Sequence, residues 1–313
     1  MLNIKSIRDT FYGSQQRYSQ YYLERARFVG QTPIKETETE LSNYEKAFSI
    51  ALQETNHIHA YNFWEALSTF LWEHGYWQKY SEWGDNTLQA LKRTGNNRMA
   101  EGRLISEIGY LKLEWGDWES AKALFSTAKD IFYEANDQHW IAVIERYIGV
   151  LSYRIGNYDD ASKHWETASD IAQQNQFQLM LVELYNLQGS LERKRKNSQA
   201  ARQLYRKSME LAESLGDKWY LTGAIRNIAQ LDADLGNLID AQKEFQEAID
   251  LCTKIDRKDM LYGCQLKLAN VEAKLGNLDG AFMLGVAARD GYRELGIKSG
   301  VDDSEEFLLS LAK

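Results

Sequence analysis

The sequence repeats itself every 40 residues over most of its length. Alanine recurs five times at this interval, and a large aromatic residue follows each of the first four alanines by four positions. The alanines are Ala121, Ala161, Ala201, Ala241 and Ala281, and the aromatic residues are Phe125, Trp165, Tyr205 and Phe245. A fixed period of this kind is typical of repeat architectures, in which each unit contacts its neighbours along the chain. We therefore expect an array of stacked units rather than one central core.

Each repeat carries a turn signal between two small positions. Twelve residues before each leading alanine lies a small residue: Gly109, Gly149, Gly189, Ala229 or Ala269. Between the two, four copies have Gly followed by Asp or Asn, and the third copy has Lys196-Asn197. Glycine ends a helix in the left-handed conformation, and Asp or Asn caps the helix that follows. Each repeat is therefore predicted to be a pair of closely packed antiparallel helices, too thin to bury its own apolar face unless it stacks.

This order of small residue, turn, alanine, aromatic and small residue resembles the tetratricopeptide repeat family. The family repeat is about 34 residues long, so the longer period here implies longer helices, as in the repeats of bacterial signalling regulators and of sensor regions of large signalling ATPases. Five clear copies cover about 98–295, and a degraded copy at 61–94 has Tyr80 at the alanine position. The resemblance implies an all-α, right-handed solenoid of about 15 antiparallel helices.

The two ends of the chain depart from the repeat. Residues 1–57 are predicted to form two extra helices, joined by a linker at Gly30–Pro33, and residues 58–296 to form the solenoid. The C-terminal region 297–313 is predicted to contain a short helix at Asp302–Ala312, with Phe307, Leu308 and Leu311 on one side. A capping role is expected for both ends, because the terminal units of a solenoid need a polar outer face.

Charge and composition narrow the class of function. A formal net charge of −8 and a pI of about 5.3 argue against general binding to nucleic acid or to an anionic membrane. No apolar run approaches the ~18 residues of a membrane span, and no secretory signal is evident, so we expect a cytoplasmic protein. Cys252 and Cys264 lack the spacing of metal ligands and are expected to be reduced core residues.

No set of residues is arranged for catalysis. His57, His59 and His74 lie close in sequence but have no further ligand at a suitable spacing, so packing or surface roles are favoured over metal binding. Neither a glycine-rich phosphate loop nor a nucleophile motif occurs. The four tryptophans in 64–83 are interpreted as core residues, with an exposed docking patch as the alternative. We expect no enzymatic activity, no cofactor and no metal.

The resemblance also implies where a partner would lie. In the tetratricopeptide family the first helix of each hairpin lines an inner groove, and the repeat register transfers that face to this sequence. The face is basic for an acidic protein, and its amides can both donate and accept hydrogen bonds. The predicted partner-binding residues are Arg103, Arg146, Tyr153, Arg154, Asn186, Arg193, Lys194, Arg226, Asn227, Asn270 and Lys274. Arginine suits a carboxylate because its planar fork donates two parallel hydrogen bonds, so we expect an acidic segment or C-terminal carboxylate of a protein or peptide.

Several alternatives stay open at the level of sequence. The predicted binding residues could be ordinary solvated side chains paired with nearby carboxylates, and this applies equally to the run at 193–196, which replaces the turn glycine. The chain is expected to be a scaffold or adaptor. A peptide- or protein-sensing receptor, or the sensor part of a larger signalling complex, is the alternative. An enzyme with its site beside the N-terminal helices is disfavoured, because no nucleophile–base pair or metal set is present.

Overall fold

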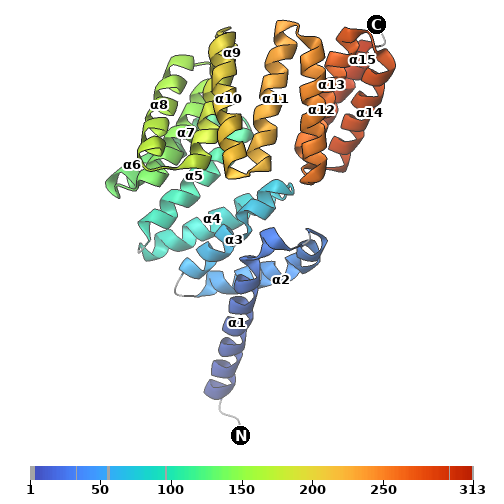
Figure 1. Ribbon diagram of the computed structural model, residues 1–313. Helices are drawn as coiled ribbons and strands as arrows, with labels where there is room; N and C mark the ends of the chain where they lie inside the picture. The colour runs from blue at the N-terminus through green and yellow to red at the C-terminus, as the bar shows by residue number, and fades with distance from the viewer. Residues whose placement is uncertain (1–3, 33, 55–56, 96, 296, 312–313) are drawn as a thin grey trace. The chain divides into compact units, whose positions relative to one another are not determined.

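The computed structural model describes residues 4–32, 34–54, 57–95, 97–295 and 297–311, and these ranges contain helices and no strand (Figure 1). The helices are α1 (Ile4–Ala26), α2 (Ile34–Gln53), α3 (Ile58–Glu73), α4 (Trp77–Thr94), α5 (Arg98–Glu114), α6 (Trp118–Glu134), α7 (Gln138–Arg154), α8 (Tyr158–Gln174), α9 (Gln178–Lys194), α10 (Ser198–Leu215), α11 (Lys218–Leu235), α12 (Leu238–Lys254), α13 (Lys258–Leu275), α14 (Leu278–Glu294) and α15 (Lys298–Leu311). A short 3-10 helix, η1 (Val29–Gln31), overlaps the start of the predicted linker before α2. The all-helical fold predicted from the repeat is confirmed.

The chain forms two compact units, Met1–Ile144 and Glu145–Lys313. The boundary falls inside α7, so the first half of this helix belongs to the first unit and its second half to the second. Within the second unit, helices α9 to α15 run alternately up and down, each packed beside the one before it (Figure 1). The division at residues 57 and 296 expected from the repeat falls between helices and stays a prediction.

The turns inside the hairpins end their first helices as expected. Four turn glycines adopt the left-handed conformation, with φ between +79° and +86°: Gly116, Gly156, Gly236 and Gly276. In the third copy Lys196 takes this place with φ +64°. A side chain other than glycine adopts this conformation at a cost, which the packing of the third hairpin must offset.

The predicted capping of the second helices is confirmed in three copies and wrong in two. The side chains of Asp117, Asn157 and Asn277 accept a hydrogen bond from the backbone N–H three residues later. Asn197 and Asn237 make no such bond. Their amide groups donate instead to Glu192 (2.7 Å) and Asp232 (2.8 Å), five residues earlier. These two side chains tie the turn to the preceding helix rather than capping the next one.

In the first three clear copies the aromatic residue packs on the small residue of the same hairpin, which explains their spacing. Trp165 and Tyr205 are fully buried. A Cβ atom added to Gly189 would lie 2.6 Å from Tyr205, and one on Gly109 would lie 2.8 Å from Phe125. No real Cβ makes contacts this short, so the close approach of the two helices, predicted from the small residues, is confirmed.

The degraded copy in the first unit is held together by aromatic packing. Tyr80 is buried at the predicted alanine position, with its ring centroid 5.4 Å from that of Trp64, and its hydroxyl donates to Glu107 (3.1 Å). Trp83 stacks on Phe48 at 4.4 Å. Trp64 and Trp83 are therefore core residues, as the favoured interpretation predicts. Of the four tryptophans in 64–83, Trp64 and Trp83 are buried, Trp72 is half-buried and Trp77 is exposed.

The C-terminal helix covers the last hairpin. α15 begins at Lys298, four residues earlier than the sequence predicts, and ends at Leu311; the predicted end at residue 312 lies outside the described residues. Phe307 is buried against Ala269 and Ala281, with Leu308 and Leu311 packed around it. The predicted apolar side of this helix is confirmed.

Candidate functional site

Polar side chains one repeat apart join the first helices of the second unit. Arg146 on α7 forms an ion pair with Glu183 on α9 at 2.6 Å. Glu183 also accepts a short hydrogen bond from the hydroxyl of Tyr220 on α11. Each partner lies 37 residues after the last. We call the surface formed by residues 145–154 together with α9, α11 and α13 the first-helix face.

Further along the same face, α9 and α11 are joined by contacts 41 residues apart. Asn227 donates from its amide nitrogen to the amide oxygen of Asn186 at 3.2 Å. Arg193 pairs with Asp234 at 2.5 Å. The structure therefore brings together three of the predicted residues, Asn186, Arg193 and Asn227, across two helices. The two asparagines stay half-buried, so an amide N–H and a carbonyl can still reach solvent.

The end of the face between α11 and α13 has an excess of positive charge. Lys267 donates to the amide oxygen of Gln230 at 2.7 Å, so its direct partner is neutral. Burial lowers the pKa of Lys267, and the nearby charges of Arg226 and Arg193 lower it further. Within the described ranges Arg226 forms no ion pair, and of these three cations only Arg193 has a carboxylate partner, Asp234. A buried cation that is repelled by nearby positive charges is stabilised most by a bound anion.

At the end of the face between α7 and α9, positive and negative charges are paired. The guanidinium of Arg146 lies 4.7 Å from the ring centroid of Tyr147 in addition to its pair with Glu183. Burial, followed by the charge of Glu183, raises the pKa of Tyr220, so this hydroxyl stays protonated and donates to Glu183. With side-chain exposures of 18% and 25%, Arg146 and Glu183 are largely withdrawn from solvent. Arg146, which the sequence places in the binding set, thus joins two helices.

The other predicted residues are spread over both units. Arg103 lies in the first unit, where it pairs with Glu65 (3.3 Å) and lies over the ring of Trp140 (4.9 Å). Tyr153 is half-buried against Trp165. Asn270 is exposed and donates to the carbonyl of its own helix, four residues earlier. The remaining three are exposed: Arg154, Lys194 and Lys274.

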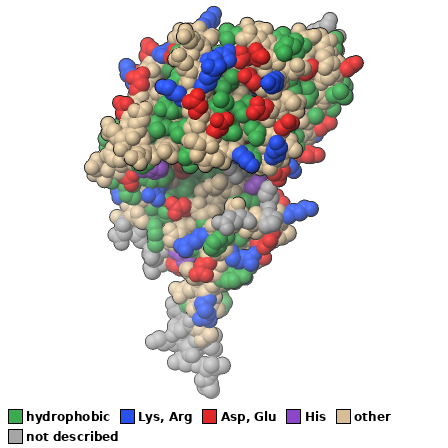
Figure 2. Space-filling view, viewed as in Figure 1, with side chains coloured by type: hydrophobic (Ala, Val, Ile, Leu, Met, Phe, Trp, Pro, Cys, Tyr) green, Lys and Arg blue, Asp and Glu red, His purple; other side chains and the backbone are tan. Residues whose placement is uncertain are grey.

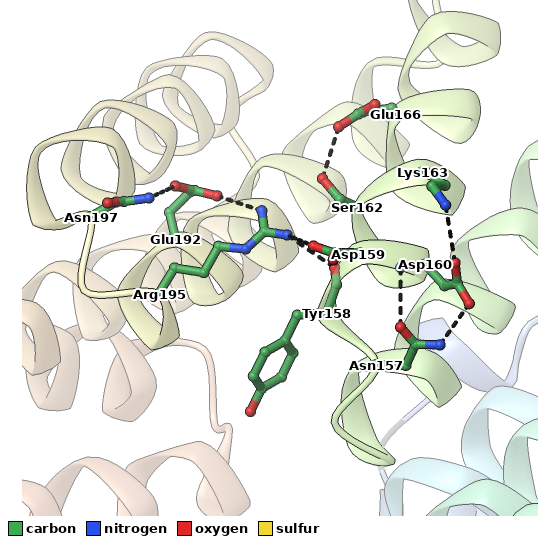
Figure 3. Close-up of polar contacts among 10 residues, drawn as sticks. All are labelled: Asn157, Tyr158, Asp159, Asp160, Ser162, Lys163, Glu166, Glu192, Arg195 and Asn197. Carbon is green, nitrogen blue, oxygen red and sulfur yellow. Dashed lines mark hydrogen bonds and ion pairs between the residues drawn. The ribbon is translucent and has the colours of Figure 1, made fainter.

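The basic run at 193–196 does not form one site. Arg195 reaches back to the preceding hairpin, where it lies 2.7 Å from Asp159 and 3.4 Å from the carbonyl of Tyr158 (Figure 3). It also donates to Glu192 at 3.1 Å, and Glu192 accepts from Asn197 on its other oxygen. Arg193, two residues earlier, pairs with α11 instead. The run therefore joins hairpins on two sides, which favours its interpretation as structural charge.

A second repeating contact was missed by sequence reasoning. Arg202 on α10 donates twice to Asp232 on α11 (2.6 and 2.7 Å), and Gln242 on α12 donates to Glu272 on α13 (2.6 Å). Both pairs are 30 residues apart, and corresponding members are 40 residues apart. The recurrence of polar residues at these two register positions was a signal that could have found them. The contacts fasten α10 to α11 and α12 to α13, which belong to successive hairpins.

Figure 2 shows basic, acidic and hydrophobic side chains interspersed over the visible face of the second unit, without a broad field of one sign. No group of three His, Cys, Asp or Glu residues in the described ranges is placed to hold a metal ion. None of the described helices combines the length and the apolar character that a membrane crossing needs.

Comparison with known proteins finds a family match within the repeats. The tetratricopeptide repeat family model matches residues 140–214, so this stretch of the chain is similar to tetratricopeptide repeats. No curated protein matches the chain in sequence. The apo form of RapI is 17% identical, with a TM-score of 0.69, over 88% of this chain and 99% of RapI. At these identities the likeness is one of fold.

Two further solved structures share this fold. NprR, a quorum sensor from B. thuringiensis, has been solved with its cognate peptide NprX; it is 16% identical, with a TM-score of 0.67, over 95% of this chain and 88% of NprR. A signal transduction ATPase with a tetratricopeptide repeat sensor, from Pyrococcus horikoshii, is 16% identical with a TM-score of 0.67. That match covers 94% of this chain, which spans 43% of the ATPase.

Proposed function

We propose that this chain binds a peptide, or an extended segment of a partner protein, on the first-helix face of its second unit. The observation that carries the proposal is the pair of half-buried cations, Arg226 and Lys267, beside the amide pair of Asn186 and Asn227. Amides that expose both a donor and an acceptor suit a peptide backbone, whatever its sequence. Cations without a carboxylate partner suit a negative group on the ligand.

The ligand that fits is an acidic segment or a C-terminal carboxylate. Arg226 can offer its fork of two N–H groups to one carboxylate. Lys267 lies close enough to Arg226 for the charge of Arg226 to lower the pKa of Lys267. A carboxylate placed between them would be partly desolvated, where a charge-assisted hydrogen bond is worth more than on an open surface. Of the residues predicted to bind the partner, Arg226, Asn186 and Asn227 form the centre of the site, and Lys267 is added to them.

The comparisons support a binding role and suggest two forms of it. NprR holds a cognate peptide, and the Pyrococcus horikoshii ATPase has a repeat region described as a sensor. The proposed function is accordingly an adaptor that holds a partner segment, or a receptor in which the ligand changes the shape of the repeats. We propose binding without enzymatic activity, in the cytoplasm, and without direct contact to nucleic acid.

A peptide library tests the proposal. Random peptides with free C-termini are screened by fluorescence anisotropy against the wild-type chain, Arg226→Glu/Lys267→Glu, and the control Lys122→Glu/Lys243→Glu, which makes the same charge change at exposed positions on second helices. We expect the wild type and the control to select the same peptides, rich in Asp and Glu or dependent on the free carboxylate. Selection of no peptide, or of the same peptides by the Arg226→Glu/Lys267→Glu variant, would overturn it.

Small-angle scattering separates the two forms. A selected peptide should alter the scattering profile of a receptor, because a ligand shifts a shape equilibrium only through different affinities for the two shapes. An adaptor with one fixed shape should give the same profile with and without the peptide, apart from the added mass.

A further inference from the structure

The turns of the last two complete hairpins carry an exposed apolar patch. Hairpins α11–α12 and α13–α14 lie side by side near the C-terminal end of the second unit (Figure 1). At these turns, and one helical turn beyond the second of them, large apolar residues are 36–67% exposed. We call them the turn-edge patch, and they are Leu235, Ile239, Leu275, Leu278, Phe282 and Met283.

The patch runs from one hairpin to the next. Gln242 on α12 donates to Glu272 on α13 at 2.6 Å, and these two helices pack antiparallel. One helical turn nearer the hairpin turns, Ile239 therefore lies opposite Leu275. Leu278 follows Leu275 across the turn, and the aromatic residue four positions later lies on the same side of α14. The members of the patch are thus neighbours in space.

Two of these positions are polar in the other hairpins. The residues in register with Phe282 are Lys122, Ser162, Arg202 and Gln242. The residues in register with Ile239 are Glu119, Asp159, Gln199 and Asp279. The terminal units of a solenoid need a polar outer face, and here the last complete hairpins have the reverse. An apolar patch at this place marks a surface that another molecule covers.

The size of the patch corresponds to one half of a small protein–protein interface. At their exposed fractions the six side chains present roughly 600 Å² of surface, the upper end of the range for the largest apolar patch on a monomer. Two such patches in contact would bury about 1,200 Å², which reaches the lower limit for a specific interface. A second copy of this chain supplies a patch of equal size.

The charges around the patch also suit a second copy. Its border has two exposed carboxylates, Asp240 and Asp279, and two exposed ammonium groups, Lys243 and Lys274. None of the four forms an ion pair within the described part of the chain. Because the chain carries a net charge of −8, two copies repel each other in general, and a border without net charge avoids that repulsion. A strongly basic or acidic partner would place like charges against one pair of border residues.

We propose that two copies of this chain associate through the turn-edge patch as a two-fold dimer. In such a contact the same residues of both copies meet, so each border lysine can approach a carboxylate of the other copy, and the assembly closes after two chains. The inference is independent of the peptide-binding proposal. Leu275 lies about 12 Å along α13 from Lys267, so the dimer leaves the proposed peptide site accessible.

Sedimentation velocity of the full-length chain over a wide range of concentration tests the proposal. We expect a monomer–dimer equilibrium without larger species. Phe282→Gln/Met283→Lys, which copies the preceding hairpin at both positions, should weaken dimerisation by about 100-fold, because it removes apolar surface from both halves of the contact. The matched control is Ile155→Arg, at a turn outside the patch where the side chain is 51% exposed. The control should dimerise like the wild type, and both variants should melt like it.

Charge exchange tests the two-fold contact itself. Asp240→Lys/Asp279→Lys and Lys243→Glu/Lys274→Glu each give the border a single sign, so each variant alone should be monomeric at low salt. An equimolar mixture of the two should form a mixed dimer. The proposal fails if the wild type stays monomeric at every concentration, which would leave the patch to a different partner. It also fails if species larger than a dimer form, if the mixture stays monomeric, or if Phe282→Gln/Met283→Lys dimerises like the wild type.

Discussion

The two ends of the first-helix face contain the same kinds of residue and use them in opposite ways. At the α7–α9 end, Arg146 meets Glu183 at 2.6 Å and the charge is cancelled inside the fold. At the α11–α13 end, Lys267 contacts a neutral amide and Arg226 forms no ion pair within the described ranges. A half-buried cation joins two repeats when the next repeat supplies its carboxylate; where the next repeat does not, we propose that the cation is left for a ligand.

The largest effect should come from reversing charge at the unbalanced end. Arg226→Glu/Lys267→Glu should weaken binding of a selected acidic peptide by about 100-fold, or roughly 3 kcal/mol, because two attractive contacts become repulsive. The melting temperature should change little, since neither cation has a carboxylate to lose. Anisotropy titration and circular dichroism measure the two quantities. If the double variant does not fold, Arg226→Gln alone replaces it in the test and should still bind the peptide more weakly than the wild type.

Removing the ion pair at the balanced end should instead lower the stability of the fold. Glu183→Gln removes the Glu183 carboxylate from the largely buried Arg146 and should lower the free energy of unfolding by about 2 kcal/mol. Urea denaturation at pH 7 measures it. The matched control is Asp159→Asn, whose carboxylate also pairs with an arginine, Arg195, but is 86% exposed. The control should cost less than about 0.5 kcal/mol; equal losses in the two variants would contradict the distinction.

A surplus carboxylate beside a balanced pair offers a pH test. Glu244 lies near the Arg202–Asp232 pair, and burial, followed by the charge of Asp232, raises its pKa from 4.5 to about 7. Between these values the folded state holds a proton that the unfolded chain has released, so the contribution of Glu244 to stability is lost as pH rises through the window. Above it, Glu244→Gln should be more stable than the wild type by about 1 kcal/mol, allowing for solvent screening of this half-buried group.

Thermal melts of both proteins from pH 4 to pH 8 check this prediction. The two stability curves should lie together at the acidic end and separate as the pH rises. Curves that stay parallel over the whole range would show that Glu244 titrates normally.

The smallest effect should come from a carboxylate at the unbalanced end, Asp234. Asp234 pairs with Arg193 and accepts from Gln230, so it competes with an incoming anion. Asp234→Asn should raise the affinity for the acidic peptide by a few-fold, about 0.5–1 kcal/mol, and the gain should shrink in high salt. A loss of affinity in titrations at low salt would mean that Asp234 positions Arg193 for the ligand instead of competing with it.

Much of the fold follows from local features of the sequence. The 40-residue register, the small residues and the aromatic residues predicted the hairpins, because a glycine such as Gly189 and an aromatic such as Tyr205 can be matched by spacing alone. Turn glycines are equally readable, since few other residues adopt their conformation. The caps were less certain: Asn197 and Asn237 have a second choice of partner five residues earlier, and the sequence did not reveal which they take.

The candidate site was likewise predicted in part from the sequence and decided in part by the tertiary structure. The register placed Arg146, Arg193 and Arg226 on one face, but it assigned all three the same role. Which of them is neutralised depends on whether a carboxylate 37 or 41 residues later meets it across two packed helices. Only the tertiary structure decides that, because the stacking of successive hairpins sets which side chains of neighbouring helices come within hydrogen-bond distance.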